Sequence, residues 1–259
     1  MSTPKSDWKL FAAEAIGTGL LLFFGISFVI LNWGEGSAVA KLIPSESARR
    51  LLTGFLFGLV GCLVTISPVG KFSGAHINPA VTLAFWLRGK IKTITMLGYI
   101  LSQFIGAVIG TLALLVWGKH AQSVQYGITL PGNSGLAYAF IVEIVATACL
   151  IIYLYVFIGR KRLRNYTPYG IPFLFAFLTW AEAALSGCST NPARSFAPAL
   201  VAGNFTDHWI YWMAPVIGVI IVTLFFRWRR MNHIFKMESA RVSYHDYPTS
   251  SSLQTGSEE

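Results

Sequence analysis

Long apolar segments, which together occupy most of the chain, restrict its fold more than any other feature. Each segment runs for 17 to 24 residues and contains at most one charged side chain. A helix needs about 20 mainly apolar residues to cross the roughly 30 Å hydrocarbon core of a bilayer. The sequence therefore predicts an all-α membrane protein with six spans, at residues 11–31, 51–67, 94–117, 136–159, 168–187 and 209–226.

The low content of charge argues against the alternative that these segments are buried helices of a soluble protein. Charged residues make up 12% of the 259 residues, against about 25% in a typical soluble domain. The first segment is also too long for the apolar core of a secretory signal peptide, and it contains Glu14. We therefore interpret it as the first span.

The net charge of +9 follows the expected topology rather than a nucleic-acid-binding surface. Short cytoplasmic loops of membrane proteins are enriched in lysine and arginine. Here these residues gather in alternate connections, at Lys5 and Lys9, at Lys71, Arg88, Lys90 and Lys92, within 160–164, and within 227–230. This distribution predicts a multi-pass protein of the cell membrane with both termini in the cytoplasm, surrounded by lipid bilayer and without a nucleic-acid partner.

The end of the chain differs in character from the rest. Residues 231–259 lack the apolar content that packing requires, so we predict a mobile cytoplasmic tail after a single transmembrane domain at residues 1–230. Three cysteines without regular spacing indicate no disulfide framework. Since no nucleophile–base pair and no metal-ligand cluster appears in the sequence, we expect no enzyme activity, no cofactor and no metal.

Two copies of one tripeptide lie on opposite sides of the predicted topology. They are Asn78-Pro79-Ala80, after the second span, and Asn191-Pro192-Ala193, after the fifth. The flanking spans repeat as well, because Glu14 and Glu143 each precede a threonine by four residues. Three spans per copy reverse the orientation of the second, and such inverted repeats place a site near the membrane midplane. We expect the repeats at about residues 8–117 and 136–228.

Each tripeptide has the composition of a helix start. Asparagine is a favoured N-cap, and proline is tolerated at the first helical position. Helices too short to span are then expected at residues 81–87 and 195–201. Glycine-rich stretches at 73–75 and 187–189 predict non-helical loops, which are tolerated at membrane depth only inside protein or beside water. The backbone carbonyls that could line a pore belong to Gly74, Ala75, His76, Gly187, Cys188 and Ser189.

The paired tripeptides in inverted context resemble those of the aquaporins, the major intrinsic protein family, and the resemblance extends over about residues 8–228. It implies two half-helices that meet at the midplane between six spans, and a homotetramer with one pore per subunit. It also implies a passive channel for water and small uncharged solutes that excludes protons and ions. The Asn78 and Asn191 amides would then face the pore centre, where the positive ends of both half-helices oppose cations.

Four residues are similar to those that form the family's selectivity filter. Arg194 directly follows the second tripeptide and stays charged at physiological pH. Cys188 precedes that tripeptide, and its thiol either faces the pore or packs inertly. Phe57 resembles the aromatic wall, although the chain from there to the first tripeptide has one extra residue. Counting back from Cys188 gives Thr179, where water-selective members usually have histidine, so we expect a wider mouth.

Charged and titratable side chains within the membrane are functional candidates, because they are costly there. The symmetric Glu14 and Glu143 are interpreted as hydrogen-bond acceptors for the backbone of the adjacent pore loop, with proton relay as the alternative. Glu182 is expected to face the outer vestibule, to pair with Arg194, or to hold an outer loop. His76 is either a pH sensor or a side chain that hydrogen-bonds within its loop.

The choice between water and glycerol rests on a few positions. Glycerol-conducting members tend to have aspartate after the filter arginine, whereas this chain has Ser195. Ala199 and the pair Tyr211-Trp212 also resemble water-type positions, and Thr179 is the exception. The sequence therefore predicts water as the main substrate, with ammonia or hydrogen peroxide as further solutes. A glycerol facilitator, a secondary transporter and a structural junction protein remain as alternatives.

Overall fold

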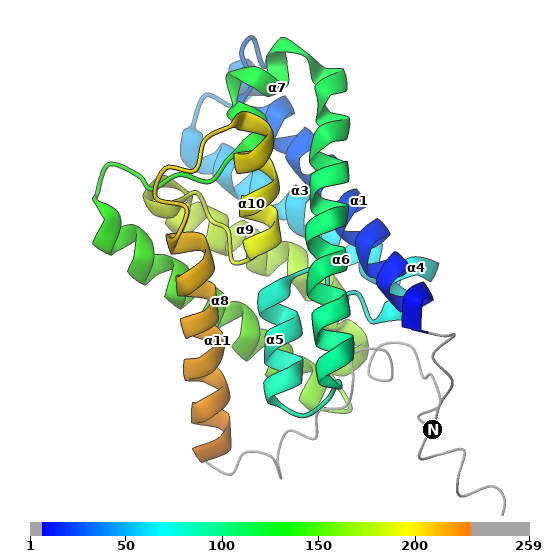
Figure 1. Cartoon of the computed structure of the whole chain (residues 1–259). Coiled ribbons are helices and arrows are strands. Elements are labelled where there is room, and N and C mark those ends of the chain that lie inside the picture. Colours follow the sequence, from blue (N-terminus) through cyan, green and yellow to red (C-terminus); the bar gives the residue numbers. More distant parts are fainter. Residues whose placement is uncertain (1–6, 229–259) are drawn as a thin grey trace, which may run out of the picture.

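The computed structural model describes residues 7–228, and it arranges them as a bundle of helices (Figure 1). Six helices are long and apolar enough to cross a membrane. They are α1 (Asp7–Trp33), α3 (Glu46–Ile66), α6 (Thr93–Leu112), α8 (Leu136–Gly159), α9 (Thr167–Ser186) and α11 (Ile210–Trp228). The predicted six-span, all-α fold is confirmed. The tail predicted at residues 231–259 lies outside the described residues.

Helix ends differ from the predicted spans where polar residues form the first or last turn. The second span was predicted to start at residue 51, but α3 starts at Glu46. Its N-cap is Ser45, whose side chain accepts a hydrogen bond from the Ala48 amide. Arg50 pairs with Glu46 one turn earlier at 2.9 Å, and such i,i+4 pairs support a helix. Hydropathy misses this turn because its residues are polar and lie outside the apolar run.

Two shorter helices fill the interior of the bundle. They are α5 (Pro79–Leu87) and α10 (Pro192–Ala202), and Figure 1 shows them in the centre, one above the other. With nine and eleven residues, neither can cross a bilayer. The predicted half-helices are therefore confirmed, and in each the proline occupies the first helical position, as the Asn-Pro order predicted.

One predicted loop residue is helical instead. Ser73 was expected in a non-helical stretch, but it is the last residue of a short helix, α4 (Pro68–Ser73). Ser67 caps this helix by accepting a hydrogen bond from the Gly70 amide at 3.3 Å, and Pro68 follows at the first helical position. The irregular backbone of the first half therefore begins at Gly74, whereas that of the second begins at Gly187, as predicted.

The remaining elements are short and lie in the connections. The predicted third span divides into α6 and the 3-10 helix η2 (Ala113–Trp117). The others are α2 (Ala38–Leu42), α7 (Lys119–Ser123), η3 (Gln125–Gly127) and η4 (Arg164–Tyr166). Of these, η3 matters most for the pore described below, because it brings the backbone of residues 125–127 against α10.

Glycines allow the spans to pack at close distance in each half. A Cβ atom on Gly106 of α6 would lie 1.9 Å from the Ala15 carbonyl oxygen of α1. The matching glycine of the second half, Gly218 of α11, would place a Cβ 2.8 Å from the Ile144 carbonyl oxygen of α8. Small residues at helix interfaces are a common means of association in membranes, because they let backbones approach closely. The pairs α1–α6 and α8–α11 thus repeat one packing arrangement.

Candidate pore

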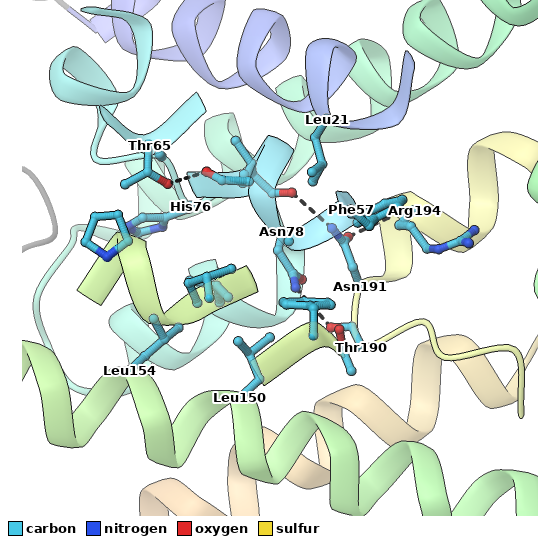
Figure 2. Close-up of a pocket in the computed structure, with 18 of the residues that line it drawn as sticks. Leu21, Phe57, Thr65, His76, Asn78, Leu150, Leu154, Thr190, Asn191 and Arg194 are labelled. Atoms are coloured by element: carbon cyan, nitrogen blue, oxygen red, sulfur yellow. Dashed lines mark hydrogen bonds between the residues drawn. The ribbon is translucent and has the colours of Figure 1, made fainter. Parts of the chain in front are cut away.

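The two Asn-Pro-Ala segments meet in the interior (Figure 2). Each asparagine caps its own half-helix, since the Asn78 side-chain oxygen accepts from the Ala80 amide at 2.8 Å and that of Asn191 accepts from the Ala193 amide at 3.1 Å. Their side-chain nitrogens cross over to the opposite loop. Asn78 Nδ2 donates to the Thr190 carbonyl and Asn191 Nδ2 to the Ile77 carbonyl, each at 3.0 Å. These crossed bonds tie the two halves together.

The crossed bonds leave part of each amide available. An asparagine NH₂ group has two hydrogens, and the crossed bond uses one of them. Both asparagines line the central cavity, and each is 5% exposed. The sequence led us to expect amides directed at the pore, but it gave no sign of the bonds to Thr190 and Ile77, because these partners lie 112 and 114 residues away.

The pore loops have matching, unusual backbone conformations. Positive φ angles occur at Gly74, Ala75 and Ile77 in the first loop, and at Gly187, Cys188 and Thr190 in the second. Residues other than glycine adopt this region at a cost of about 1–3 kcal/mol each, unless the surroundings hold them there. Two buried carboxylates supply that support.

Glu14 of α1 holds the first loop. It is fully buried and accepts hydrogen bonds from the His76 amide at 3.0 Å and from the Ile77 amide at 2.7 Å. A third donor, Gln103 Nε2 of α6, lies 2.8 Å from the same carboxylate. The charge is thus surrounded by donors, as buried charges generally require.

Glu143 of α8 makes the equivalent contacts in the second loop. It is also fully buried, and it accepts hydrogen bonds from the Ser189 amide at 2.7 Å and from the Thr190 amide at 3.0 Å. The third donor here is the Ser186 hydroxyl, 2.9 Å from Oε1. Each carboxylate accepts these bonds only from backbone and side-chain donors of its own half.

Two cavities follow one another past these loops. The central one measures about 80 Å³ and includes Gly74, Ala75, His76, Asn78, Ser189 and Asn191 in its lining. The outer one measures about 330 Å³ and includes Trp33, Arg50, Thr53, Thr179, Gly187 and Cys188. Four residues line both cavities and so form the neck between them: Phe57, Phe175, Ser189 and Arg194.

Arg194 is fixed in the neck by its neighbours. Its Nη1 atom donates to the Gly127 carbonyl at 2.7 Å, and its guanidinium carbon lies 5.5 Å from the centre of the Phe57 ring. Burial to 7% exposure places this charge in a low-dielectric setting. The Gly127 carbonyl was missed at the sequence level, because nothing in residues 118–135 indicates that their backbone reaches the neck.

The other residues named from the filter resemblance also gather here. Thr179 Oγ1 lies 3.6 Å from Cys188 Sγ on the wall of the outer cavity. Phe57 contributes to the neck despite the extra residue that separates it from the first tripeptide. Phe175 was not predicted, although its place one helical turn before Thr179 on α9 puts both on one face and could have indicated it.

Ser195 belongs to a network that anchors the outer connection. Its hydroxyl accepts from Thr129 Oγ1 at 2.7 Å and lies 2.5 Å from Ser189 Oγ. In the first half the matching pair is Thr82 and His76, whose Oγ1 and Nδ1 atoms lie 3.2 Å apart. Ser195 was considered only as a marker of substrate class, and the structure shows that it also joins the second pore loop to the segment after η3.

Two histidines occupy different settings. His76 is 3% exposed, stacks on Phe85 with ring centres 4.6 Å apart, and contacts Tyr99 edge-on. Its Nδ1 atom lies 3.2 Å from Thr82 Oγ1, so its side-chain polar contact is with α5 rather than within its own loop. His208 lies just before α11, where Phe205 and Tyr211 surround it and partial burial lowers its pKa.

Glu182 does not pair with Arg194 in the part of the chain that the structure describes. It is 4% exposed, and its Oε2 lies 3.3 Å from Ser186 Oγ. The suggestion that it faces the vestibule is also not met, since Glu182 is absent from the residues that line the outer cavity. Within residues 7–228 there is no group of three or more histidine, cysteine, aspartate or glutamate side chains that could hold a metal ion.

Comparison with known proteins agrees with this architecture. The family model described as major intrinsic protein matches residues 1–226. The lens fiber major intrinsic protein of Lithobates pipiens is 34% identical over 219 residues, which cover 82% of this chain and 78% of that protein. Aquaporin-2 of Bos taurus is 34% identical over 220 residues, covering 83% and 76%.

A solved structure shares the fold. The aquaglyceroporin from Plasmodium falciparum superposes with a TM-score of 0.72 at 20% identity, covering 85% of this chain and 96% of that one. Members of the matched family are passive channels rather than enzymes, and they carry water or small solutes across membranes. The chain is thus a multi-pass membrane channel that belongs to the major intrinsic protein family.

Proposed function

We propose that this channel conducts mainly water, passes slightly larger neutral solutes such as ammonia and hydrogen peroxide, and excludes protons and ions. The observation that carries the proposal is the neck. Arg194 and Phe57 lie against each other there, and the small side chain of Thr179 lies beside it on the outer side. An aromatic ring and a fixed cation leave room for a small polar molecule, while the threonine leaves one side less filled than an imidazole would.

The exclusion of cations follows from positive charge at two places along the pore, the neck and the central cavity. Arg194 supplies a full charge in the neck, where low dielectric strengthens its repulsion. Further in, α5 and α10 begin at Asn78 and Asn191, so the positive ends of both helix dipoles lie at the central cavity. A permeating cation would meet both, and the oxygens of Glu14 and Glu143 cannot coordinate it because loop amides and side-chain donors occupy them.

A water molecule that enters the pore loses hydrogen bonds to bulk water, and groups on the pore wall can replace them. The free hydrogen of each asparagine amide and the carbonyls of the pore loops offer donors and acceptors along the central cavity. We propose that Gly74, Ala75, His76, Gly187, Cys188 and Ser189 supply those carbonyls. A water that accepts from both asparagines has its oxygen engaged at the midpoint, which hinders proton transfer along the file.

A second candidate is a glycerol facilitator, and one observation favours it. The outer cavity of about 330 Å³ is large enough to admit a polyol, and Thr179 lies on its wall. Against it, Phe57 and Phe175 both narrow the neck, and Ser195 is used to anchor the outer connection. We therefore place glycerol below water as a substrate.

The oligomeric state, the membrane and the topology of the channel are proposed as well. We propose a homotetramer in the cell membrane with cytoplasmic termini. Support for the topology comes from the connections at one end of the spans, which carry Arg88, Lys90, Lys92, Arg160, Lys161, Arg162 and Arg164. The other end carries Lys41 and Lys119 in its connections and Arg49 and Arg50 near the start of α3.

Stopped-flow shrinkage of proteoliposomes tests the proposal, with water, urea, ammonia and glycerol compared in one preparation. We expect rapid water flux that does not saturate and does not depend on a sodium or proton gradient. A glycerol flux that matches the water flux would instead establish the facilitator. Saturation with gradient dependence would indicate a transporter, and flux equal to that of empty liposomes would indicate a structural junction protein.

A further inference from the structure

Glu182 is a buried acid that the channel mechanism does not use. It lies on α9 one turn before Ser186. Its Oε1 atom has no hydrogen-bond partner among residues 7–228, and no ion pair joins it to a described cation. Burying an unpaired carboxylate costs many kcal/mol, so such groups are generally neutral. Its polar contacts are with the Ser186 hydroxyl and with the Cys188 thiol, a weak donor, and its state can be deduced from the contact with Ser186.

The hydrogens around Ser186 can be counted. A serine hydroxyl donates one hydrogen and accepts two bonds. Ser186 Oγ lies 2.9 Å from Glu143 Oε1 and 3.3 Å from Glu182 Oε2, and it accepts from the Cys188 amide at 3.3 Å. If the one hydroxyl hydrogen goes to the nearer acceptor, Glu143, then the contact with Glu182 is a hydrogen bond only when Glu182 is the donor. Glu182 must then carry a proton.

The other groups near Glu182 favour the same state. Glu143 and the Cys149 thiol of α8 face it, as do the Cys188 thiol and the Tyr211 hydroxyl of α11. None of these is a cation. The guanidinium of Arg194, the nearest positive group of α10, donates to the Gly127 carbonyl instead. A second carboxylate beside Glu143 would therefore be repelled, and paired carboxyl groups in such sites share one proton.

Ser186 connects this acid to the neck. Its hydroxyl holds the Cys188 amide, and the Cys188 thiol in turn contacts Thr179 on the wall of the outer cavity. Two of the proposed filter residues thus depend on one serine, which is shared between two carboxyl groups. The first half has no such arrangement, because the position that matches Glu182 by its distance from the tripeptide is Val69.

We propose that Glu182 is a protonated positioning residue, which holds the Cys188 side of the filter through Ser186 and releases it when alkaline pH removes the proton. This inference rests on the proposed channel function. When the proton is lost, Glu143 and the Glu182 carboxylate compete for one hydroxyl hydrogen and repel each other. The Cys188 wall then loses its fixed position, and the filter discriminates less well between water and larger neutral solutes.

The test is the ratio of urea to water permeability in proteoliposomes of the full chain, measured from about pH 6 to about pH 9. We expect the wild-type ratio to rise about threefold on the alkaline side. Glu182→Gln keeps a donor for Ser186 but cannot ionise, so its ratio should stay at the neutral value throughout. Glu182→Ala removes the donor, so its ratio should be high and independent of pH. Glu46→Gln, an exposed carboxyl at the outer end of α3, should behave as wild type.

Infrared spectroscopy gives a second readout that does not depend on flux. The wild type near neutral pH should show the carbonyl stretch of a protonated carboxyl group, which disappears on the alkaline side and is missing in Glu182→Gln. A wild-type ratio that does not change with pH, or an unchanged carboxyl band in Glu182→Gln, would overturn the proposal. Neither result would affect the proposed function, which depends on the water flux at neutral pH.

Discussion

The two pore loops are built to one plan but are supported by different side chains. In each half a buried glutamate accepts two successive backbone amides, and a tyrosine of the third span binds the last helical carbonyl before the loop. Tyr99 donates to the Ser73 carbonyl at 2.6 Å, and Tyr211 to the Ser186 carbonyl at 2.7 Å. The shared contacts are made to backbone groups of the loops, so they occur in both halves although the loop side chains differ.

The difference lies in the third donor to each glutamate. The first half uses the amide of Gln103, four residues after its tyrosine, whereas the second half has Pro215 at that spacing and no side-chain donor there. Ser186 supplies the missing hydrogen from within α9, with Glu182 behind it. An amide cannot titrate near neutral pH, but a carboxyl group can. The comparison teaches that the same backbone geometry can be held by a pH-independent or by a pH-dependent set of contacts.

The largest expected effect tests the helix packing of the two halves. Gly106→Val should destabilise the protein by about 3 kcal/mol or more, because its new atoms would overlap the Ala15 carbonyl of the adjacent backbone. Gly218→Val should cost less, about 1 kcal/mol, since the matching space is wider. Thermal unfolding of the purified protein in detergent measures both.

A matched control for these variants lies on α3. A Cβ on Gly61 would meet its nearest atoms at 3.9 Å, which is ordinary contact, so Gly61→Ala should not lower the unfolding temperature, and the loss of a glycine inside the helix should raise it slightly. Equal losses for Gly106→Val and Gly218→Val would mean that the two helix pairs do not differ in closeness.

The next effect concerns the two supporting glutamates. Glu14→Gln and Glu143→Gln each leave one backbone amide of a pore loop facing an NH₂ group instead of an acceptor, at a cost of about 1–3 kcal/mol. We expect similar losses of water flux and of stability in both variants. If one of them kept wild-type flux, the loops would not depend on their carboxylates to the same degree.

A third test makes the halves more alike. The residue three positions after Asn191 is Arg194, whereas that after Asn78 is Val81. Arg194→Val should retain water flux and raise the leak of protons or cations at least about tenfold, because the fixed charge in the neck is gone. A pH-sensitive dye inside liposomes measures the leak. Lys41→Ala, at an exposed lysine of α2, serves as the control, and an unchanged leak in Arg194→Val would remove Arg194 from the filter.

A smaller effect is expected from mercury. Only the second loop has a thiol at the position next to its first glycine, since Cys188 corresponds to Ala75. Mercury should reduce water flux by attaching to Cys188 on the outer cavity wall, while Cys188→Ser should conduct and resist it. Equal inhibition of both proteins would assign the effect to Cys62 or Cys149.

The smallest expected change concerns the width of the mouth. A Cβ on Gly54 would lie 2.6 Å from Thr179 Oγ1, so the helix side of Thr179 is already filled and a larger ring must extend into the outer cavity. Thr179→His should therefore lower permeability to urea or hydrogen peroxide about threefold, and lower water flux less. The measurement is the ratio of solute to water permeability, determined on one preparation of each protein. If this ratio is the same in Thr179→His and in the wild type, Thr179 does not belong to the filter.

Local patterns in the sequence were sufficient to predict the fold and its two half-helices. Apolar length gave the six spans, and the Asn-Pro order gave the starts of α5 and α10, because both signals act over a few residues. Glu14 and Glu143 could be singled out because they occupy equivalent positions in the two repeats, and each copy supports the interpretation of the other.

The contacts that could not be predicted join residues far apart in the chain. Gly127 reaches Arg194 over 67 residues through a backbone carbonyl, which every residue has, so no residue type indicates it. The role of Ser186 depends on the exact distances to two carboxyl groups on different helices. Even the local helix α4 was missed, because residues 68–72 lie between the predicted second span and the predicted loop, and the signal for this helix is the cap at Ser67 followed by Pro68.

The crossed asparagine bonds have a consequence for how the protein is made. Asn78 and its partner Thr190 are separated by 112 residues, so the second half must be synthesised before the first loop finds its partner. At about 5–20 residues per second, this interval lasts roughly 6 to 22 seconds. During that time the Asn78 amide and the Ile77 carbonyl are unmatched polar groups on a nascent chain. The translocation machinery or trapped water has to shield them until the second half is inserted.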